Sequence, residues 1–575
     1  MDAMVRRTRL LGRPKAILAA LAVVAASTLS AAHGEPVRGR HGMVSSQEAI
    51  ATRVGLDILE AGGNAVDAAV AVGFALAVTL PRAGNIGGGG FMLVHHAKSG
   101  ETVAIDYREM APAAAHPDMF LDAKGEVDKQ RARYSHKSAG VPGTVAGLTL
   151  ALRKYGTMKL AQVMAPAIGL ARDGFAVDEG FRGSFTEQRV GGLRRWPESR
   201  RVFFKPDGSL YAIGETFRQP DLARSLTAIA KRGAAAFYEG EIGARIAAEM
   251  KAFGGLITRA DLQAYRAIIR KPVRGTYRGH EIVSMPPPSS GGVHLIQMLN
   301  ILEGYDLGAW GAGSAVTIHH MAEAMKLAYA DRSKYLGDPD FWRVPAKGLT
   351  SKAYAAALRA RIDPDRARPA DEIGPGMPLP HESRETTHYS VADRHGNAVS
   401  NTYTLNFAFG SRIVARGTGI VLNNEMDDFS AKPGVPNAFG LIGGEANAVE
   451  AGKRPLSSMT PTLVFKDDQP VLITGSPGGS RIITTVLQVI SNVIDHAMDI
   501  ARATAAPRMH HQWRPDRLHL EPGIDEDVIA ELKRKGFHVR ESRKIGSTQS
   551  IRRLPDGTLA GASDPRRVGA LTLGY

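Results

Sequence analysis

Apolar residues recur along the first part of the chain at the spacing of amphipathic helices. Residues 47–78 are rich in Ala, Val and Leu, and the breakers Gly62-Gly63-Asn64 divide them into a predicted helix, turn and helix. Four glycines at 87–90 disfavour a helix and lead into a predicted strand over 91–95. Helical periodicity returns over about 140–265, with polar loops near 194–201 and 205–208. A rigid Pro-rich loop at 286–292 precedes a helix that begins near Val293, and another helix is expected over 315–334.

The pattern changes in the second part of the chain. No period survives between residues 363 and 385, where Pro, Asp, Arg and Glu dominate, so we expect a mobile segment there. Residues 387–392 then alternate as a strand, and 397–405 are the predicted partner across the turn at Arg394-His395-Gly396. Further strands are expected at 462–465 and 471–474. The pattern predicts a mixed α and β protein whose C-terminal third is richer in strands.

The first 32 residues predict export. A basic region precedes the apolar run 16–26, and the small residues Ser30-Ala31-Ala32 follow, which is the order of a secretory signal peptide. The apolar run is shorter than the roughly 20 residues that a membrane-spanning helix needs. We therefore expect cleavage near Ala32, no stable membrane anchor, and a periplasmic or secreted protein. The adjacent Arg6-Arg7 leaves twin-arginine export open.

Composition narrows the possible chemistry. The 575 residues are 44% hydrophobic and 22% charged, as in an ordinary globular protein of one large or two medium domains. The net charge is +15, but the basic residues are scattered and not interleaved with aromatics, so nucleic-acid binding is not expected. The chain contains no cysteine, which excludes disulfides, a cysteine nucleophile and thiolate metal ligands.

Several common signatures are missing from the sequence. There is no serine in Gly-x-Ser-x-Gly, no P-loop and no HExxH motif, and the glycine run at 87–90 lacks the third glycine of a dinucleotide fingerprint. The pairs His319-His320 and His510-His511 have no carboxylate at ligand spacing. We interpret them as structural histidines, and expect no metal and no cofactor.

The junction between the aperiodic segment and the following strand offers a nucleophile. If the bond before Thr386 were cut, this residue would carry both a hydroxyl and a free α-amine. An α-amine has a pKa of about 8, so its neutral form can act as a general base. A Thr386-Thr387 pair that opens a strand is also what β-propensity alone produces. The residues by themselves leave both interpretations open.

Five later segments change this balance, because in their order and spacing they resemble the gamma-glutamyltransferase family. They are Thr386-Thr387-His388-Tyr389-Ser390, Thr402-Tyr403-Thr404-Leu405-Asn406, Leu422-Asn423-Asn424-Glu425-Met426-Asp427-Asp428-Phe429, Arg454-Pro455-Leu456-Ser457-Ser458-Met459 and Gly475-Ser476-Pro477-Gly478-Gly479-Ser480-Arg481. Earlier segments at 63–69, 106–109 and 286–292 match as well, so the resemblance extends from about residue 40 to the end.

The resemblance implies an α+β fold of the N-terminal nucleophile (Ntn) hydrolase type, a four-layer αββα sandwich formed by two chains from one precursor. The precursor would cut itself between Glu385 and Thr386. The expected parts are a signal peptide (1–32), a large subunit (33–385) and a small catalytic subunit (386–575), which remain associated as a heterodimer. The implied activity is that of a glutathione hydrolase and gamma-glutamyltransferase, in which Thr386 passes the γ-glutamyl group to water, amino acids or peptides.

The resemblance also assigns roles in the site. Thr404 would assist Thr386, and the backbone N–H groups of Gly478 and Gly479 would stabilise the oxyanion. The segment 432–445 would be a lid, with Phe439 in place of an aromatic gate that is often tyrosine.

A γ-glutamyl group carries an α-carboxylate and an α-ammonium, so its pocket needs both signs of charge side by side. The expected partners of the carboxylate are Arg108, Ser457 and Ser458. The expected partners of the ammonium are Asn406, Glu425 and Asp428, although many bacterial relatives have glutamine at position 425.

Two alternatives remain at this stage. A cephalosporin or glutaryl acylase would have the same fold and nucleophile, but its substrates lack the α-ammonium or present it differently, so Asp428 beside Arg108 disfavours it. A secreted protein that binds amino acids without chemistry would remain a single uncut chain.

Overall fold

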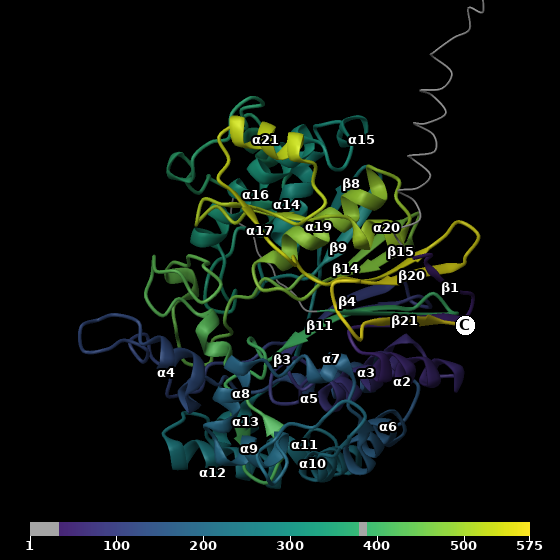
Figure 1. The fold of residues 1–575 in the computed structure, drawn as a ribbon, viewed down its shortest axis with the longest axis vertical. Helices are drawn as coiled ribbons and strands as arrows, with labels where there is room; N and C mark the ends of the chain where they lie inside the picture. The colour runs from purple at the N-terminus through teal and green to yellow at the C-terminus, as the bar shows by residue number, and fades with distance from the viewer. Residues whose placement is uncertain (1–33, 379–387) are drawn as a thin grey trace, which may run out of the picture.

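Two seven-stranded antiparallel sheets form the centre of a computed structural model that describes residues 34–378 and 388–575 (Figure 1). The predicted signal peptide, Thr386 and the predicted cleavage site lie outside the described residues. Sheet A has the order β1 (Val37–Gly39), β20 (Leu559–Ser563), β19 (Gln549–Arg553), β15 (Gln469–Thr474), β14 (Thr462–Lys466), β9 (His280–Ser284), β8 (Val273–Tyr277). Sheet B has the order β21 (Leu571–Gly574), β2 (Gly42–Ser46), β10 (Tyr389–Asp393), β11 (Ala398–Thr404), β3 (Gly89–His96), β4 (Glu101–Tyr107), β7 (Ile268–Arg270).

The two sheets pack face to face through an apolar layer. Strand β3 shows why, because its side chains alternate between two buried environments. Phe91 and Leu93 belong to the layer between the sheets, whereas Met92 and Val94 belong to the core beneath the helices. A strand that is apolar on both faces can only lie inside a sandwich.

Helices cover the outer face of each sheet. On sheet B lie α2 (Ala49–Glu60), α3 (Ala65–Thr79) and α5 (Thr144–Tyr155), and α14 (Gly291–Leu302) packs on β8 and β9 of sheet A. Two further helices, α16 (Ala315–Tyr335) and α19 (Arg481–Ile494), pack against α14 (Figure 1). The order helix, sheet, sheet, helix confirms the predicted αββα sandwich.

The remaining elements extend these layers. They are α4 (Lys129–Tyr134), η2 (His136–Ser138), α6 (Leu160–Asp173), β5 (Phe175–Ala176), α7 (Glu179–Arg182), α8 (Glu187–Arg194), α9 (Pro197–Phe203), β6 (Thr216–Phe217), α10 (Pro220–Arg232), α11 (Ala235–Tyr238), α12 (Glu241–Phe253), α13 (Arg259–Ala264), α15 (Leu307–Trp310), α17 (Ala346–Leu349), α18 (Lys352–Arg359), η3 (Ala370–Glu372), β12 (Val414–Ala415), β13 (Ile420–Val421), η4 (Glu425–Asp428), η5 (Glu445–Asn447), α20 (Ile500–Ala505), β16 (Met509–His510), β17 (Leu518–Leu520), α21 (Glu526–Arg534) and β18 (Val539–Glu541). Within the described residues no helix combines the length and apolarity required to cross a bilayer.

Most predicted elements are confirmed. The helix, turn and helix over 47–78 are α2 and α3, and the hairpin after the aperiodic segment is β10 and β11. The polar loop expected near 194–201 is wrong, because α9 begins at Pro197. Proline is favoured at a helix start, and the buried Ser199 and Phe203 lie one turn apart on its inner face.

The described part of the segment expected to be mobile, 363–378, makes specific contacts with the C-terminal part of the chain. The indole Nε1 of Trp513 donates to the carbonyls of Ala370 (2.9 Å) and Ile373 (3.0 Å), and the backbone N–H of Ala370 donates to Asp516 (2.8 Å). The segment lacks a period because its backbone is held by side chains rather than by a regular element.

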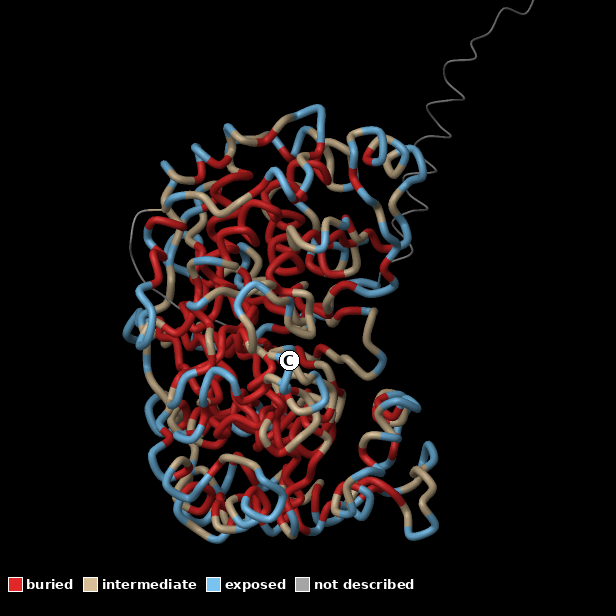
Figure 2. The backbone as a smooth tube through the Cα atoms, turned by 90° about the vertical axis from the view of Figure 1, so that its left-hand side faces the viewer, coloured by how far each residue is buried: buried red, intermediate tan, exposed pale blue. Residues whose placement is uncertain are grey.

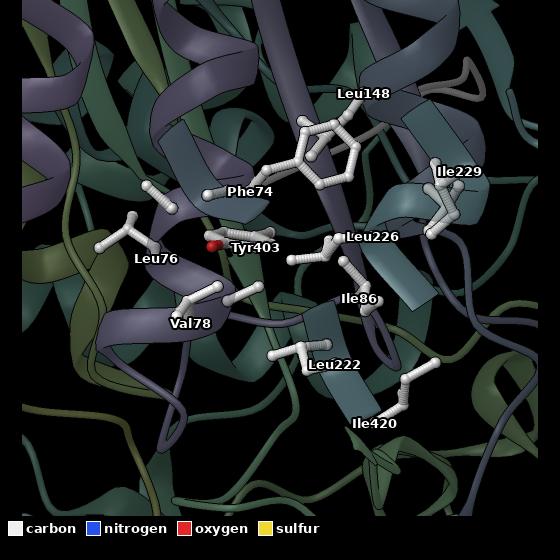
Figure 3. Close-up of a cluster of buried hydrophobic side chains, with 14 of the residues drawn as sticks. Phe74, Leu76, Val78, Ile86, Leu148, Leu222, Leu226, Ile229, Tyr403 and Ile420 are labelled. Carbon is white, nitrogen blue, oxygen red and sulfur yellow. The ribbon is translucent and has the colours of Figure 1, made fainter. Parts of the chain in front are cut away.

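The buried residues are concentrated in the sheets and on the inward faces of the helices (Figure 2). The helices that cover sheet B enclose the cluster drawn in Figure 3, in which Phe74 of α3 lies close to Leu148 of α5. Tyr403 of β11 joins this cluster through its ring, and its hydroxyl donates to the carbonyl of Gly73 (2.9 Å). This contact ties the strand that ends in the candidate site to the helix below it.

Phe74 has no exposed surface, and truncation to alanine would leave a cavity beneath β11. We expect Phe74→Ala to lower the free energy of unfolding by about 3–5 kcal/mol, measured by denaturant unfolding of the purified protein. The control Ile213→Ala removes a side chain that is 61% exposed, and should leave the midpoint nearly unchanged. Equal midpoints for Phe74→Ala and wild type would contradict the packing described here.

Candidate active site

A cavity of about 360 Å³ opens at the end of β11, between the segment 432–445 and the loop that follows β15. Its lining includes eight of the ten site residues expected from the sequence: Thr404, Asn406, Glu425, Asp428, Ser457, Ser458, Gly478 and Gly479. Thr386 lies outside the described residues, but His388, two residues later, lines the same cavity. The structure therefore brings together residues from five separate segments of the chain.

Thr404 is the last residue of β11, and backbone contacts fix its position. Its carbonyl accepts from Asn85 Nδ2 (2.9 Å), and its Oγ1 accepts from the backbone N–H of Asn406 (2.8 Å). The glycine run at 87–90 passes directly beside it, since a Cβ on Gly88 would lie 2.0 Å from the Thr404 carbonyl oxygen. The run is thus explained by close backbone packing rather than by nucleotide binding.

Gly478 and Gly479 form a turn between β15 and α19, with φ angles of 141° and 58° that disfavour other residues. Within the described part of the chain, neither backbone N–H donates a hydrogen bond. A Cβ on Gly479 would lie 2.6 Å from the ring of Phe439. Two unused N–H groups that line a cavity can bind a developing oxyanion.

Arg108 follows β4 and is completely buried beneath the cavity, outside its lining. Its Nη2 donates to Asp428 Oδ2 (2.6 Å), its Nη1 donates to Glu425, and its Nε donates to the carbonyl of Pro455 (3.2 Å). The sequence-based interpretation expected an open fork for a substrate carboxylate. In the structure the protein's own carboxylates occupy this fork, because a buried guanidinium requires a partner.

Three carboxylates surround this one guanidinium. Glu109 lies 3.6 Å from Arg108, and its two carboxylate oxygens accept no hydrogen bond within the described residues. Burial raises the pKa of Glu109 to about 7, against the opposing effect of Arg108. Burial likewise raises the pKa values of Glu425 and Asp428, again opposed by Arg108. Three carboxyl groups thus share one guanidinium, and Glu425 Oε2, like both oxygens of Glu109, accepts no hydrogen bond within the described residues, so Glu425 can accept one from a cation in the adjoining cavity.

The serine pair is supported from behind by the Pro-rich loop 286–292. The Ser457 backbone N–H donates to the carbonyl of Pro288 (2.9 Å) and its carbonyl accepts from the N–H of Ser290 (3.0 Å). Arg332 of α16 lines the cavity and joins both segments, because its Nε donates to Ser290 Oγ (2.9 Å) and its Nη2 donates to Ser458 Oγ (3.2 Å).

Sequence reasoning missed Arg332 entirely. It lies in the last turns of a long buried helix, and no spacing in the sequence distinguishes it from a helix-end cation. Three more arginines of the lining were also missed: Arg82, Arg189 and Arg567.

The segment 432–445 places Phe439 against the cavity. The ring of Phe439 packs edge-on against Phe407, with centroids 5.6 Å apart, and its backbone N–H donates to Asn437 Oδ1 (3.0 Å). The Phe439 carbonyl accepts from Gln512 Nε2 (3.1 Å). The aromatic side chain therefore forms an apolar wall beside Gly479.

The paired histidines make short contacts within the fold. His319 Nε2 lies 2.7 Å from the carbonyl oxygen of Asp363, and His510 Nδ1 lies 2.8 Å from Thr484 Oγ1. No group of three or more His, Asp or Glu residues in the described ranges could hold a metal ion.

A four-layer αββα sandwich, with a cavity at the end of its central strands, defines a protein of the Ntn-hydrolase fold class. The sequence pattern of gamma-glutamyltranspeptidase matches residues 51–573, and the chain belongs to this family.

Individual proteins agree with this assignment. The chain is 57% identical to a glutathione hydrolase proenzyme of Escherichia coli, over 94% of this chain and 93% of that protein. It is 41% identical to an acylase ACY 1 proenzyme of a Pseudomonas species, over 92% and 93% respectively. A solved cephalosporin acylase from Bacillus halodurans superposes with a TM-score of 0.82 at 28% identity, covering 95% of this chain and 97% of that one.

Because burial raises the pKa of Glu109, the pH dependence of the free energy of unfolding can test whether this carboxyl group is buried. A carboxyl whose pKa is raised on folding binds its proton more tightly in the folded state, so wild-type stability should fall as the pH rises from 4.5 to 7. We expect Glu109→Gln to reduce this decline by about 2–3 kcal/mol between pH 5 and pH 8 in denaturant unfolding, which is the share that Glu109 contributes. The control Glu241→Gln removes an exposed carboxylate and should retain the wild-type pH dependence. Parallel curves for wild type and Glu109→Gln would refute the assignment.

Proposed function

We propose that the mature protein is a glutathione hydrolase and gamma-glutamyltransferase that uses Thr386 as its nucleophile. The observation that carries the proposal is one cavity that joins buried carboxylates, a serine pair and two unused glycine N–H groups beside the start of β10. Family membership and the relative named glutathione hydrolase proenzyme support the same activity.

The proposed reaction has two steps. The Thr386 hydroxyl attacks the γ-carbonyl carbon while the α-amine of the same residue takes its proton. The N–H groups of Gly478 and Gly479 stabilise the oxyanion, and the amine then returns the proton to the leaving nitrogen as the amide bond breaks. Water or an acceptor amine attacks the resulting ester, which releases glutamate or a new γ-glutamyl amide and restores the hydroxyl. Thr404, beside the cavity, assists the Thr386 hydroxyl in this scheme.

The free α-amine arises by cleavage of the precursor between Glu385 and Thr386, which divides it into a large subunit (33–385) and a small subunit (386–575). Each central sheet contains strands from both sides of this point. The two chains would therefore stay together as a heterodimer. Residues 1–32 act as the signal peptide, and the mature protein is periplasmic or secreted.

Recognition of the γ-glutamyl end of the substrate uses both acidic and basic side chains. Asp428 and Glu425 receive the α-ammonium together with Asn406, and by turning toward it they release Arg108 for the α-carboxylate. Ser457 and Ser458 donate to the same carboxylate. Since Ser458 Oγ already accepts from Arg332, its own hydroxyl hydrogen is available for donation.

A glutaryl or cephalosporin acylase is the second candidate, because two of the similar proteins are named acylases. The carboxylates around Arg108 argue against it, since a glutaryl group has no ammonium to neutralise them.

Thr386→Ala should remain a single uncut chain and be inactive, because it has no hydroxyl to attack the preceding carbonyl. Electrophoresis should show two bands for wild type and one for the variant, and the smaller wild-type band should begin at Thr386 on N-terminal sequencing. Thr387→Ala is the matched control and should still be cut. Cleaved Thr386→Ala, or an active uncut wild type, would exclude the proposal.

Substrate preference separates the two candidate activities. Wild type should hydrolyse γ-glutamyl-4-nitroanilide with a kcat/KM at least about 100-fold above that of glutaryl-4-nitroanilide, because loss of a buried ammonium leaves its carboxylate partners unpaired. Asp428→Asn should narrow this ratio by raising KM for the γ-glutamyl donor. A preference for glutaryl in wild type would favour the acylase.

A further inference from the structure

Three arginines reach the catalytic cavity from distant parts of the chain. Arg82 lies in the loop between α3 and β3, Arg189 lies in α8, and Arg567 lies in the loop between β20 and β21. All three line the cavity that contains Thr404, Gly478 and Gly479. The proposed two-step reaction leaves them without a role.

These half-buried arginines differ from the fully buried Arg508 and Arg454 because no carboxylate forms an ion pair with them within the described residues. Arg508 pairs with Asp564 at 2.7 Å, and Arg454 pairs with Asp106 at 3.2 Å. Within 34–378 and 388–575, by contrast, Arg82, Arg189 and Arg567 form no ion pair. The one side-chain hydrogen bond among them in this range runs from Arg189 Nη1 to the carbonyl of Ser184 (3.0 Å).

The three guanidinium groups also repel one another. Burial, together with the charges of Arg567 and Arg189, lowers the pKa of Arg82 to about 9. Burial and Arg189 lower the pKa of Arg567, with a partial opposing effect from Asp564. Glu425 and Asp428 line the same cavity, but their ion pairs are with Arg108. The cavity thus contains a separate cationic group that an anion would stabilise.

A substrate of the proposed enzyme offers such an anion. In glutathione the part beyond the scissile amide is a dipeptide that ends in a carboxylate, and an acceptor amino acid or peptide ends in the same group. Two extended residues reach about 7 Å, so the carboxylate lies well away from the γ-glutamyl end. Guanidinium groups bind carboxylates by paired, charge-assisted hydrogen bonds.

We propose that Arg82, Arg189 and Arg567 form a subsite for the terminal carboxylate of the leaving or accepting part of the substrate. The inference rests on the proposed function, because it requires a γ-glutamyl donor in the same cavity. It makes the enzyme selective for γ-glutamyl peptides and for acceptors with a free carboxylate over uncharged amides and amines.

The donor arm of the test compares γ-glutamyl-4-nitroanilide with its 3-carboxy derivative, which differs by one carboxylate on the leaving group. The measured quantity is the ratio of kcat/KM for the carboxylated donor to that for the neutral donor. We expect Arg82→Gln with Arg567→Gln to lower this ratio about tenfold, mainly through KM, and 0.5 M NaCl to lower the wild-type ratio.

Arg194→Gln is the matched control. Arg194 ends α8, the helix of Arg189, but its Nη2 donates to the carbonyl of Gly208 at the surface, outside the cavity. Its removal takes one positive charge from the same helix and should leave the ratio unchanged. A similar fall in Arg194→Gln would assign the effect to net charge and overturn the subsite.

The acceptor arm compares glycylglycine with glycylglycinamide in transfer from the neutral donor. If the wild-type KM is lower for glycylglycine than for glycylglycinamide and this difference is lost in the double variant, the acceptor carboxylate binds at the arginines. If only the donor ratio changes in the double variant, the carboxylate of the leaving group binds there. Equal losses for charged and neutral partners in both arms would overturn the subsite. Failure of the proposed function is distinct, because wild type would then hydrolyse neither anilide.

Discussion

The pairing of β10 between β2 and β11 is the constraint on which the site depends. Residues 390–393 pair with 42–45 on one side and residues 389–392 pair with 398–401 on the other. His388, just before this strand, is buried between the sheets with Nε2 2.6 Å from the Gln549 carbonyl and Nδ1 3.1 Å from Ser400 Oγ. Burial lowers the pKa of His388 to about 3, so the ring is neutral and its Nε2–H donates to that carbonyl. The start of β10 is thereby attached to both sheets.

The fixed position of β10 allows the charged groups around the cavity to be in place before a substrate binds. Arg108 lies beneath the site with Glu425 and Asp428 as partners, and these contacts offset the cost of desolvating the three groups until a substrate supplies other partners. In the proposed function, a substrate ammonium that approaches from the cavity meets carboxyl groups that the guanidinium has already oriented. Their attraction is stronger here than at the surface, because little water screens it. In the proposal, selectivity for the α-ammonium and burial of the charged groups both follow from the packing of Glu425 and Asp428 around Arg108.

Much of the fold follows from local pattern. Turn residues at 62–64 and 394–396 separate elements that periodicity identifies, and the structure confirms both pairs. Of the ten site residues that the sequence motifs identified, eight line one cavity in the structure. The sequence could not show which carboxyl groups form ion pairs with the buried Arg108. It also could not show which arginines line the same cavity. Arg82 and Arg567 are separated by most of the chain, so neither periodicity nor spacing relates them.

The sandwich also explains how the two parts of a chain without cysteine could stay associated after a cut between them. Sheet B alternates strands from 34–378 with strands from 388–575, since β10 and β11 lie between β2 and β3. In sheet A, residues 462–465 of β14 pair with residues 281–284 of β9. A break within 379–387 removes none of these backbone hydrogen bonds. Separation of the two parts would expose the apolar layer around Phe91 and Leu463 as well. The interleaved sheets would therefore hold the two proposed chains together without a disulfide.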